Sequence, residues 1–476
     1  MNRILLLALF ASLACTARTQ NIPDSLTPAQ VRADLDFVVR TIESVHPDPW
    51  HDISRARFLR LRDSLAATVR SEVGSEAVYP LVARLCASLN EGHTHAWATP
   101  LSSKVIKGII PVFPVLMRDA SESGFTVVTD LSGDSVLHAG DRIVAINGEG
   151  TKKLFAKFLK LYGGLDAWRR TRLQNDLIPL LYAAGLRPPY RLRIDRKGQR
   201  FDVTRDALAY GTFKPRRDAW RQQHAPAAKA PDYNYERIDS NIALINVNTM
   251  EGDPGAFWNF LDTTFGQIAN SPTKGVIIDL RRNGGGNSLF GWYLFSFINK
   301  KPLRMSGDVF WKVSPEVREW YRGRDSAQRA RLDSGLWARY LALNDGAILR
   351  LPASAPEVPE HNERRFDGPV AFLIGPHTFS SANMTAATVA DYGLATLFGE
   401  DTGEPANDYG EVLYFDTPNA RVNFGTSSKL FVRPNGLRAD KSPVHPDFEV
   451  KASEGSDAVL QAARAWIINE AQRRLP

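Results

Sequence analysis

Two adjacent serines, Ser380 and Ser381, are the first residues whose surroundings could support chemistry. An apolar run at residues 370–374 ends in a Gly-Pro pair, and a helix-like stretch begins at Ala382. A buried strand, a tight turn and a helix start thus fall within one short segment. This arrangement exposes a serine hydroxyl and leaves backbone N–H groups at the helix start for a developing oxyanion. Serine is also a common helix cap, so the segment alone predicts either a nucleophile or a cap.

A run of three glycines, Gly284 to Gly286, follows a second predicted buried strand that ends near Asp279. The run lacks the lysine and Ser/Thr of a P-loop and the spacing of a dinucleotide-binding loop, so no nucleotide is expected there. Three glycines do supply a turn with exposed N–H groups and no side chain in the way. Such a turn suits an oxyanion hole.

Two histidines, His93 and His95, lie in a Gly-containing loop after a predicted helix. They are either solvated loop residues or candidate general bases, since imidazole titrates near neutral pH. No cysteine–histidine cluster has zinc spacing, and no His-Glu-x-x-His motif occurs in the sequence. We therefore expect no metal ion and no cofactor.

The composition is that of a soluble globular protein. The 476 residues are 43% hydrophobic and 23% charged, and this length predicts two to four domains. The net charge of +7 comes from scattered basic residues, with neither a basic block nor a nucleic-acid-binding motif. We therefore expect no nucleic-acid partner.

Residues 1–20 have the layout of a secretory signal peptide, with an arginine before an apolar run that is too short to span a bilayer. Cys15 directly follows a small-x-small cleavage site, so its lipidation and attachment to a membrane are an alternative to plain export. Ser12 stands where a lipoprotein site usually has leucine, which favours plain export to the periplasm or the medium. The other cysteine, Cys86, is expected in the core without a disulfide.

Hydrophobic periodicity divides the chain into units. In one unit, strands alternate with glycine-rich turns and helices, which indicates an α/β core with a mostly parallel sheet. In another, a strand before an Asn-Gly turn at residues 147–148 resembles the core of a PDZ domain. We expect a helical lobe at 24–100, a PDZ-like β-rich module at 105–206, a linker at 207–240, the core at 241–455 with a helical insertion at 305–365, and a terminal helix at 456–476.

Several segments, in this order, resemble the tail-specific (carboxy-terminal processing) serine peptidase family. They are residues 276–286, ending in Asp-Leu-Arg-Arg-Asn-Gly-Gly-Gly, then Thr-Phe-Ser-Ser-Ala-Asn at 378–383 and Gly-Glu-Asp-Thr-Gly at 399–403. The segment Leu-Asn-Glu-Gly-His-Thr at 89–94 is similar to the branch of the tricorn core protease and the interphotoreceptor retinoid-binding protein. The resemblance implies a crotonase-like (ClpP/crotonase) spiral core, with a PDZ-like module between it and an N-terminal helical lobe.

The resemblance also implies roles for individual residues near the serines. Ser380 matches the nucleophile of the family. The N–H groups of Ser381 and of one glycine in the run, with Gly285 favoured over its neighbours, match the oxyanion hole.

The base and the acid follow from the same resemblance. Processing peptidases carry a lysine base in the segment that corresponds to residues 401–406, and this segment has no lysine. The tricorn-like branch uses a histidine, which His93 matches, with His95 as the alternative. Its acid is a glutamate, and Asp440 stands at that place. The implied triad is Ser380, His93 and Asp440.

The expected function is that of an exported serine peptidase acting on peptides or unfolded proteins through this triad. One alternative is a non-catalytic or weakly catalytic binding protein for apolar ligands or peptides on the same scaffold. A third possibility is an esterase or another acyl hydrolase with the same triad. A peptidase hydrolyses peptides, whereas an esterase hydrolyses esters without peptides, so comparing the two substrates separates these enzymes. If neither substrate is hydrolysed, the binding protein is favoured.

Overall fold

The computed structural model describes residues 22–224, 230–239, 241–323, 334–360, 362–451 and 456–473. The expected signal peptide, and Cys15 with it, lies outside the described residues. None of the described helices combines the length and the apolar character needed to cross a membrane.

The N-terminal lobe is helical, as the sequence predicts. Thr27 closes a capping box with Gln30 at the start of the first helix, and Pro28 occupies its first position. Cys86 is fully buried as a free thiol, as expected of a core residue. The elements are β1 (Ser25–Leu26), α1 (Pro28–Val45), α2 (Arg55–Ala67), β2 (Val73–Gly74), the 3₁₀ helix η1 (Ser75–Val78), α3 (Tyr79–Ala87) and α4 (Thr99–Ile106).

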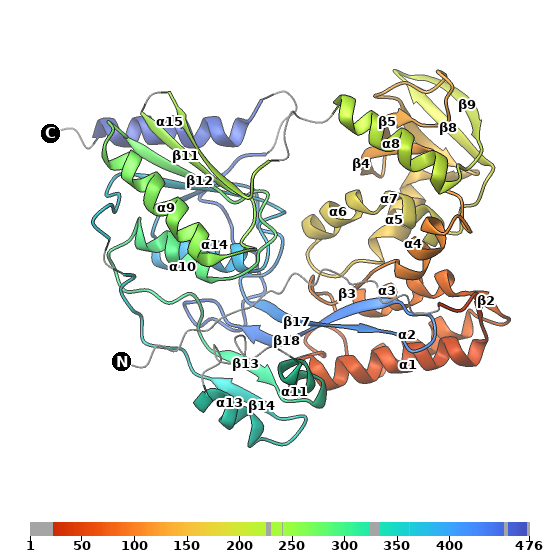
Figure 1. The fold of residues 1–476 in the computed structure, drawn as a ribbon, viewed down its shortest axis with the longest axis horizontal. Helices are drawn as coiled ribbons and strands as arrows, with labels where there is room; N and C mark the ends of the chain where they lie inside the picture. Colours follow the sequence, from red (N-terminus) through yellow and green to blue (C-terminus); the bar gives the residue numbers. More distant parts are fainter. Residues whose placement is uncertain are drawn as a thin grey trace.

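An antiparallel sheet follows, with strand order β4-β5-β6-β8-β9 and β7 paired to β6. The expected Asn-Gly turn joins β6 to β7, with Asn147 and Gly148 both at positive φ. We call this unit the β module; it lies at the upper right in Figure 1. Its elements are β4 (Val115–Ser121), β5 (Gly124–Asp130), β6 (Arg142–Ile146), β7 (Glu149–Gly150), α5 (Thr151–Leu159), α6 (Asp166–Asn175), α7 (Leu177–Ala183), β8 (Tyr190–Arg196) and β9 (Gln199–Arg205).

The stretch expected to be a linker contains a helix, α8 (Tyr210–His224). Phe213 is buried beside Val112 and Leu131, and Trp220 packs against the same cluster. The Ala-, Arg- and Gln-rich composition concealed this helix, because few apolar residues anchor it to the β module.

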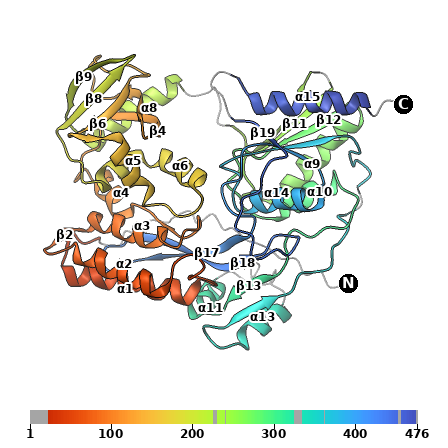
Figure 2. The same cartoon turned by 180° about the vertical axis from the view of Figure 1, so that it is seen from behind.

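The core contains a six-stranded sheet of order β10-β11-β12-β15-β16-β19, parallel except for β10. Helices α9, α10 and α14 pack on one face of this sheet and α15 on the other, as Figures 1 and 2 show from opposite sides. Strands that are buried on both faces read as continuous apolar runs, which is why the sequence located them. The elements are β10 (Tyr233–Ile238), β11 (Ile242–Val247), α9 (Pro254–Ala269), β12 (Gly275–Asp279), α10 (Leu289–Ser296), β15 (Val370–Ile374), α14 (Ser381–Tyr392), β16 (Thr396–Gly399), β19 (Phe448–Glu449) and α15 (Ala458–Arg473).

A second, antiparallel sheet of order β14-β13-β18-β17 lies below the core in Figure 1. The segment 305–365, which was expected to be a helical insertion, also supplies two strands of this sheet. These strands are stabilised because Val309 and Trp311 are buried against Tyr340 and the neighbouring helices. The elements are β13 (Val309–Lys312), α11 (Pro315–Arg322), α13 (Ser334–Leu341), β14 (Ile348–Leu351), β17 (Asp408–Asp416) and β18 (Asn423–Phe431).

The β17–β18 hairpin connects the core to the N-terminal lobe. Strand β3 (His95–Ala96) pairs with β18, with His95 opposite Gly425 and Ala96 opposite Phe424. The turn of the hairpin is held by Asp34 of α1, whose buried carboxylate accepts hydrogen bonds from the backbone N–H groups of Asn419 and Ala420. Residues more than 300 positions apart are thereby fixed side by side.

We expect Asp34→Ala to lower the free energy of unfolding by about 2–3 kcal/mol, because two buried N–H groups lose their acceptor. Denaturant titration of the purified protein measures this change. Asp63→Ala is the control, since Asp63 is half exposed and its loss should cost less than about 1 kcal/mol. Equal destabilisation by the two substitutions would contradict a special role for Asp34.

Candidate active site

Ser380 occupies the sharp turn between β15 and α14. Its backbone has φ 54° and ψ −129°, a conformation that costs a non-glycine residue about 1–3 kcal/mol. Thr378 stabilises the turn, because its hydroxyl donates to the carbonyl of Leu280 and accepts from the N–H of Gly375. Ser380 makes no side-chain cap for α14, so the cap interpretation does not explain this residue. A strained serine at a strand–turn–helix junction is the geometry of a nucleophile elbow.

The glycine run lies directly against this turn. A Cβ atom on Gly285, whose φ is +101°, would stand 2.6 Å from the Cβ of Ser380, so only glycine fits there. The hydroxyl of Ser381 donates to the carbonyl of Gly286 at 2.6 Å, which joins the two turns. The structure thus brings together Ser380, Ser381 and the glycine run, which lie about a hundred residues apart in the sequence.

The backbone N–H groups around Ser380 differ in their availability. The N–H of Ser380 itself donates to the carboxylate of Glu404, and the N–H of Gly285 donates to Asn283 Oδ1 at 2.9 Å. Within the described part of the chain, no hydrogen bond uses the N–H of Ser381 or that of Gly286. The N–H of Ser381, one of the two expected donors, is therefore available to an oxyanion. The N–H of Gly285 is already hydrogen-bonded, and the lack of a side chain at Gly285 leaves room for Ser380.

His93 enters the same region from the N-terminal lobe, through the loop that precedes β3. It is only 6% exposed, and its ring lies 4.6 Å from the ring of Phe379, the residue before Ser380. Neither ring nitrogen of His93 has a hydrogen-bond partner. Burial lowers the pKa of His93 to about 4, although the charge of Glu91 opposes this shift. The imidazole is therefore neutral at pH 7 and able to accept a proton.

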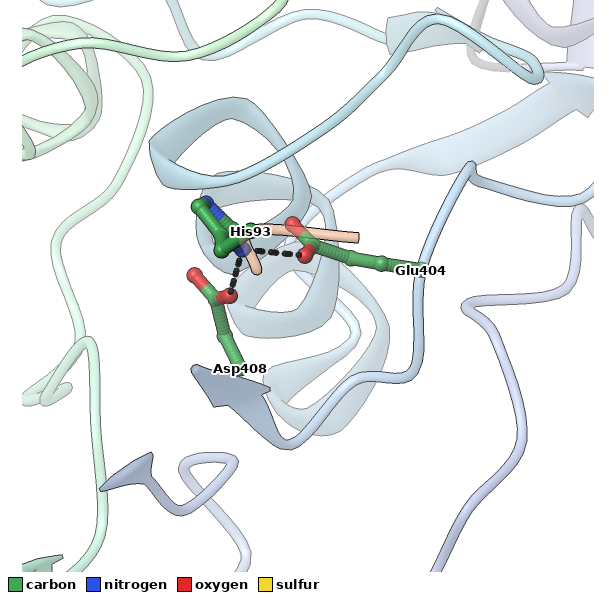
Figure 3. Close-up of side chains that lie close together, drawn as sticks. All are labelled: His93, Glu404 and Asp408. Carbon is green, nitrogen blue, oxygen red and sulfur yellow. Dashed lines mark ion pairs between the residues drawn. The ribbon is translucent and has the colours of Figure 1, made fainter. Parts of the chain in front are cut away.

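Two carboxylates face Nδ1 of His93, as Figure 3 shows. Glu404 Oε2 is 3.4 Å from it and Asp408 Oδ1 is 3.7 Å from it. Burial, and then the negative charge of Asp408, raises the pKa of Glu404, and burial likewise raises the pKa of Asp408. At neutral pH the pair therefore retains a proton between its two carboxyl groups.

Glu404 connects the histidine to the serine. One of its oxygens accepts the backbone N–H of Ser380, and the other faces His93. The sequence prediction did not include Glu404 and Asp408. The available signal was the segment 401–406, which has no lysine and contains Glu404.

Asp440, the acid expected from the sequence, is not brought to His93. Its carboxylate accepts hydrogen bonds from Arg433 and from the hydroxyl of Ser442. Although burial would raise the pKa of Asp440, these two partners lower it. The carboxylates that the structure places beside His93 are therefore Glu404 and Asp408, whereas the expected acid Asp440 is paired with Arg433.

The alternative base, His95, points away from these carboxylates. Its Nδ1 lies 3.1 Å from the carbonyl oxygen of His93, and its ring packs on Trp97 at 4.0 Å between centroids. Burial lowers the pKa of His95 to about 3. His93, rather than His95, is therefore the histidine in the cluster.

A second buried pair supports His93 from behind. Glu91 accepts the backbone N–H of His93 at 2.5 Å, and its other oxygen is 3.7 Å from Nε2 of His46. Burial would raise the pKa of Glu91, but the contacts with His46 and His93 lower it to about 2. Nδ1 of His46 accepts the N–H of Asp48, so a neutral His46 carries its proton on Nε2, toward Glu91.

The site is covered by an aromatic stack. Ser380 is 4% exposed, and Phe379 stacks on Trp168 of α6 with ring centroids 3.8 Å apart and an interplanar angle of 9°. The indole also closes on the turns at Gly92 and Gly403, where an added Cβ would meet it at 2.8 and 3.2 Å. The β module therefore contributes a side chain to the wall of the site.

A strained serine, a neutral buried histidine and a carboxylate joined to both define the class of protein: a serine hydrolase with a mixed α/β fold. Residues 241–450 match the model of peptidase family S41. These residues form a peptidase family S41 domain, and the chain is a serine peptidase. The recognition of the tail-specific serine peptidase family from the sequence is confirmed.

Solved structures show the same fold at low sequence identity. Mature CPAF complexed with lactacystin has a TM-score of 0.57 and 16% identity, over 94% of this chain and 98% of that chain. A CPAF mutant with one serine changed to alanine has a TM-score of 0.60 and 14% identity, over 94% and 97%. The comparison with curated proteins gave no match.

We expect Gly285→Ala to slow the reaction of Ser380 with a fluorophosphonate about 100-fold, because the new methyl group displaces the nucleophile. Intact-mass spectrometry over a time course measures adduct formation. Gly284→Ala is the matched control, since a Cβ at residue 284 meets open space and its φ is not positive. Similar slowing in both variants would contradict the close approach of Gly285.

Proposed function

We propose that the protein hydrolyses peptide bonds with Ser380 as nucleophile, His93 as general base and Glu404 as the acid that orients the base. The observation that carries the proposal is the position of Glu404, which accepts the N–H of the strained Ser380 and faces Nδ1 of His93. This arrangement retains the expected Ser380 and His93 and replaces Asp440 by Glu404.

In the proposed reaction, His93 Nε2 takes the proton of the Ser380 hydroxyl while the oxygen attacks the carbonyl carbon of the scissile bond. The Glu404 carboxylate accepts the Nδ1–H of His93 and stabilises the imidazolium that forms. The Glu404–Asp408 pair retains one proton, which leaves one carboxylate charge beside His93. The same imidazolium then donates its proton to the leaving amine.

The oxyanion of the tetrahedral intermediate needs two donors. The free N–H of Ser381 at the start of α14 is one, and a free N–H of the Gly284–Gly286 run is the other. Each well-placed donor contributes about 3–4 kcal/mol to transition-state stabilisation.

The proposed substrates are peptides or unfolded proteins, since Ser380 is only 4% exposed and a flexible chain reaches a buried serine more easily than a folded surface does. We further propose that the core is crotonase-like, that the β module is PDZ-like, and that the protein is exported, with lipid attachment at Cys15 as the alternative to plain export. The Asn147–Gly148 turn between β6 and β7 and the antiparallel strand order support the second of these.

We expect Ser380→Ala to abolish both the fluorophosphonate adduct and the cleavage of an unstructured fluorogenic peptide, because no other group can form the acyl intermediate. Mass spectrometry and a peptide assay measure the two effects. Turnover of esters without peptides would favour the acyl-hydrolase alternative. A wild-type protein that forms no adduct and cleaves neither substrate would contradict the proposed activity.

We expect Glu404→Gln to reduce kcat/KM about 10³- to 10⁴-fold, because a neutral amide neither fixes the tautomer of His93 nor stabilises its charged form. Peptide hydrolysis under limiting substrate measures the ratio. Asp440→Asn is the paired variant, since it tests the acid that the sequence indicated. A larger loss in Asp440→Asn than in Glu404→Gln would reverse the assignment.

A further inference from the structure

His93, Glu404 and Asp408 form a compact group of possible metal ligands. Their ligand atoms all lie within 4.8 Å of one another, and all three residues are buried. In Figure 3 both carboxylates point toward the same ring nitrogen of His93. Nδ1 of His93 and Oδ1 of Asp408 are buried atoms without a hydrogen-bond partner, and each is aimed into the group.

The spacing of the three atoms fits a tetrahedral ion. Bonds of about 2.0–2.1 Å to nitrogen and oxygen place neighbouring ligands about 3.3–3.4 Å apart. The observed separations from Nδ1 are 3.4 Å to Glu404 Oε2 and 3.7 Å to Asp408 Oδ1. Small side-chain rotations would therefore complete three protein ligands and leave a fourth position for water.

The charge of the group also favours a cation. Among the described residues, neither Glu404 nor Asp408 forms an ion pair with a lysine or an arginine, and each has His93 as its partner. Buried carboxylates without a cationic partner are costly, and metal coordination is one way to compensate them. One imidazole with two carboxylates suits Zn²⁺ and similar transition metals better than Ca²⁺ or Mg²⁺, which prefer oxygen ligands.

We propose that His93, Glu404 and Asp408 bind a divalent transition-metal ion of the Zn²⁺ type, and that this ion reversibly inhibits the peptidase. The inhibitory effect rests on the proposed function of His93, whereas the binding site does not. Coordination of Nδ1 leaves the proton of a neutral imidazole on Nε2. That nitrogen then has no lone pair to accept the proton of Ser380, so the base is switched off while the ion is bound.

The geometry around Glu404 allows both states. Its Oε1 remains on the backbone N–H of Ser380, and only Oε2, which lies 3.4 Å from Nδ1 of His93, turns to the ion. Asp408, which has no direct contact with Ser380 in the described structure, becomes the third ligand. The serine turn keeps its conformation, so inhibition needs no unfolding of the site.

Binding is tested with Co²⁺ and Zn²⁺ on the full chain carrying Ser380→Ala, in which proteolysis cannot interfere. We expect one equivalent of Co²⁺ to bind with the intense visible absorption of a tetrahedral complex, and Zn²⁺ to displace it. Asp408→Asn, which keeps the shape of the side chain, should weaken Co²⁺ binding about tenfold or more. His95→Gln is the matched control and should bind as tightly as the parent. Thermal unfolding shows whether each variant is folded.

Absence of the tetrahedral spectrum in a folded parent, or equal affinity in Asp408→Asn and His95→Gln, would overturn the site. If binding occurs, Zn²⁺ should suppress fluorophosphonate labelling of the wild-type protein, and EDTA should restore it. Labelling that is unaffected by bound Zn²⁺ would overturn the inhibitory role. Failure of the peptidase proposal gives a different result: an inert wild-type protein that still binds Co²⁺ through Asp408.

Discussion

The active arrangement depends on a backbone pairing of only two residues. His95 and Ala96 pair with Gly425 and Phe424 of β18, and this fixes the loop that carries His93. Thr94 adds a hydroxyl contact of 3.0 Å to Thr426. The proposed base, His93, and the proposed nucleophile, Ser380, belong to parts of the chain that share no strand of the core sheet. Their meeting therefore requires that the β17–β18 hairpin extend into the N-terminal lobe, where Asp34 holds its turn.

A second constraint is the burial of three carboxyl groups around one imidazole. Glu91 is held ionised by its histidine contacts and fixes the backbone of His93, while Glu404 and Asp408 share a raised pKa and retain a proton. A low-dielectric site strengthens the orienting interaction that catalysis needs. The same burial leaves a negative charge beside Nδ1 of His93. Orientation of His93 as a base and binding of a cation thus use the same atoms, Nδ1 of His93 and the facing carboxylate oxygens. The two therefore exclude each other.

The strained serine turn shows how the surrounding structure maintains an unfavourable conformation. The hydroxyl of Thr378, the N–H contact from Ser380 to Glu404 and the Ser381 bond to Gly286 each fix one side of the turn. Gly285 is required because any Cβ would collide with Ser380. Several ordinary hydrogen bonds together offset the cost of about 1–3 kcal/mol for this backbone conformation. The proposed nucleophile, Ser380, is thereby held in position before substrate binds.

The sequence by itself determined the elements of the core and the nucleophile segment. Apolar runs such as β11 and β15 are buried on both faces, so their pattern does not depend on the partner strand. The capping box at Thr27 and the Asn147–Gly148 turn depend only on neighbouring residues, so the sequence predicted them as well. The match of Ser380 and His93 to a family motif also required no coordinates.

The tertiary structure decided which carboxylates meet His93. Glu404 and Asp408 reach it through a loop and a strand start, more than 300 residues along the chain. Asp440 stands at the family's position in the sequence, but a nearby arginine draws its side chain elsewhere. The helix α8 and the strands of the insertion were missed for a related reason, since a few long-range contacts stabilise them against their composition. The spacing of apolar residues along a chain indicates its local conformation. Which partner a charged side chain meets depends on long-range contacts that form only on folding.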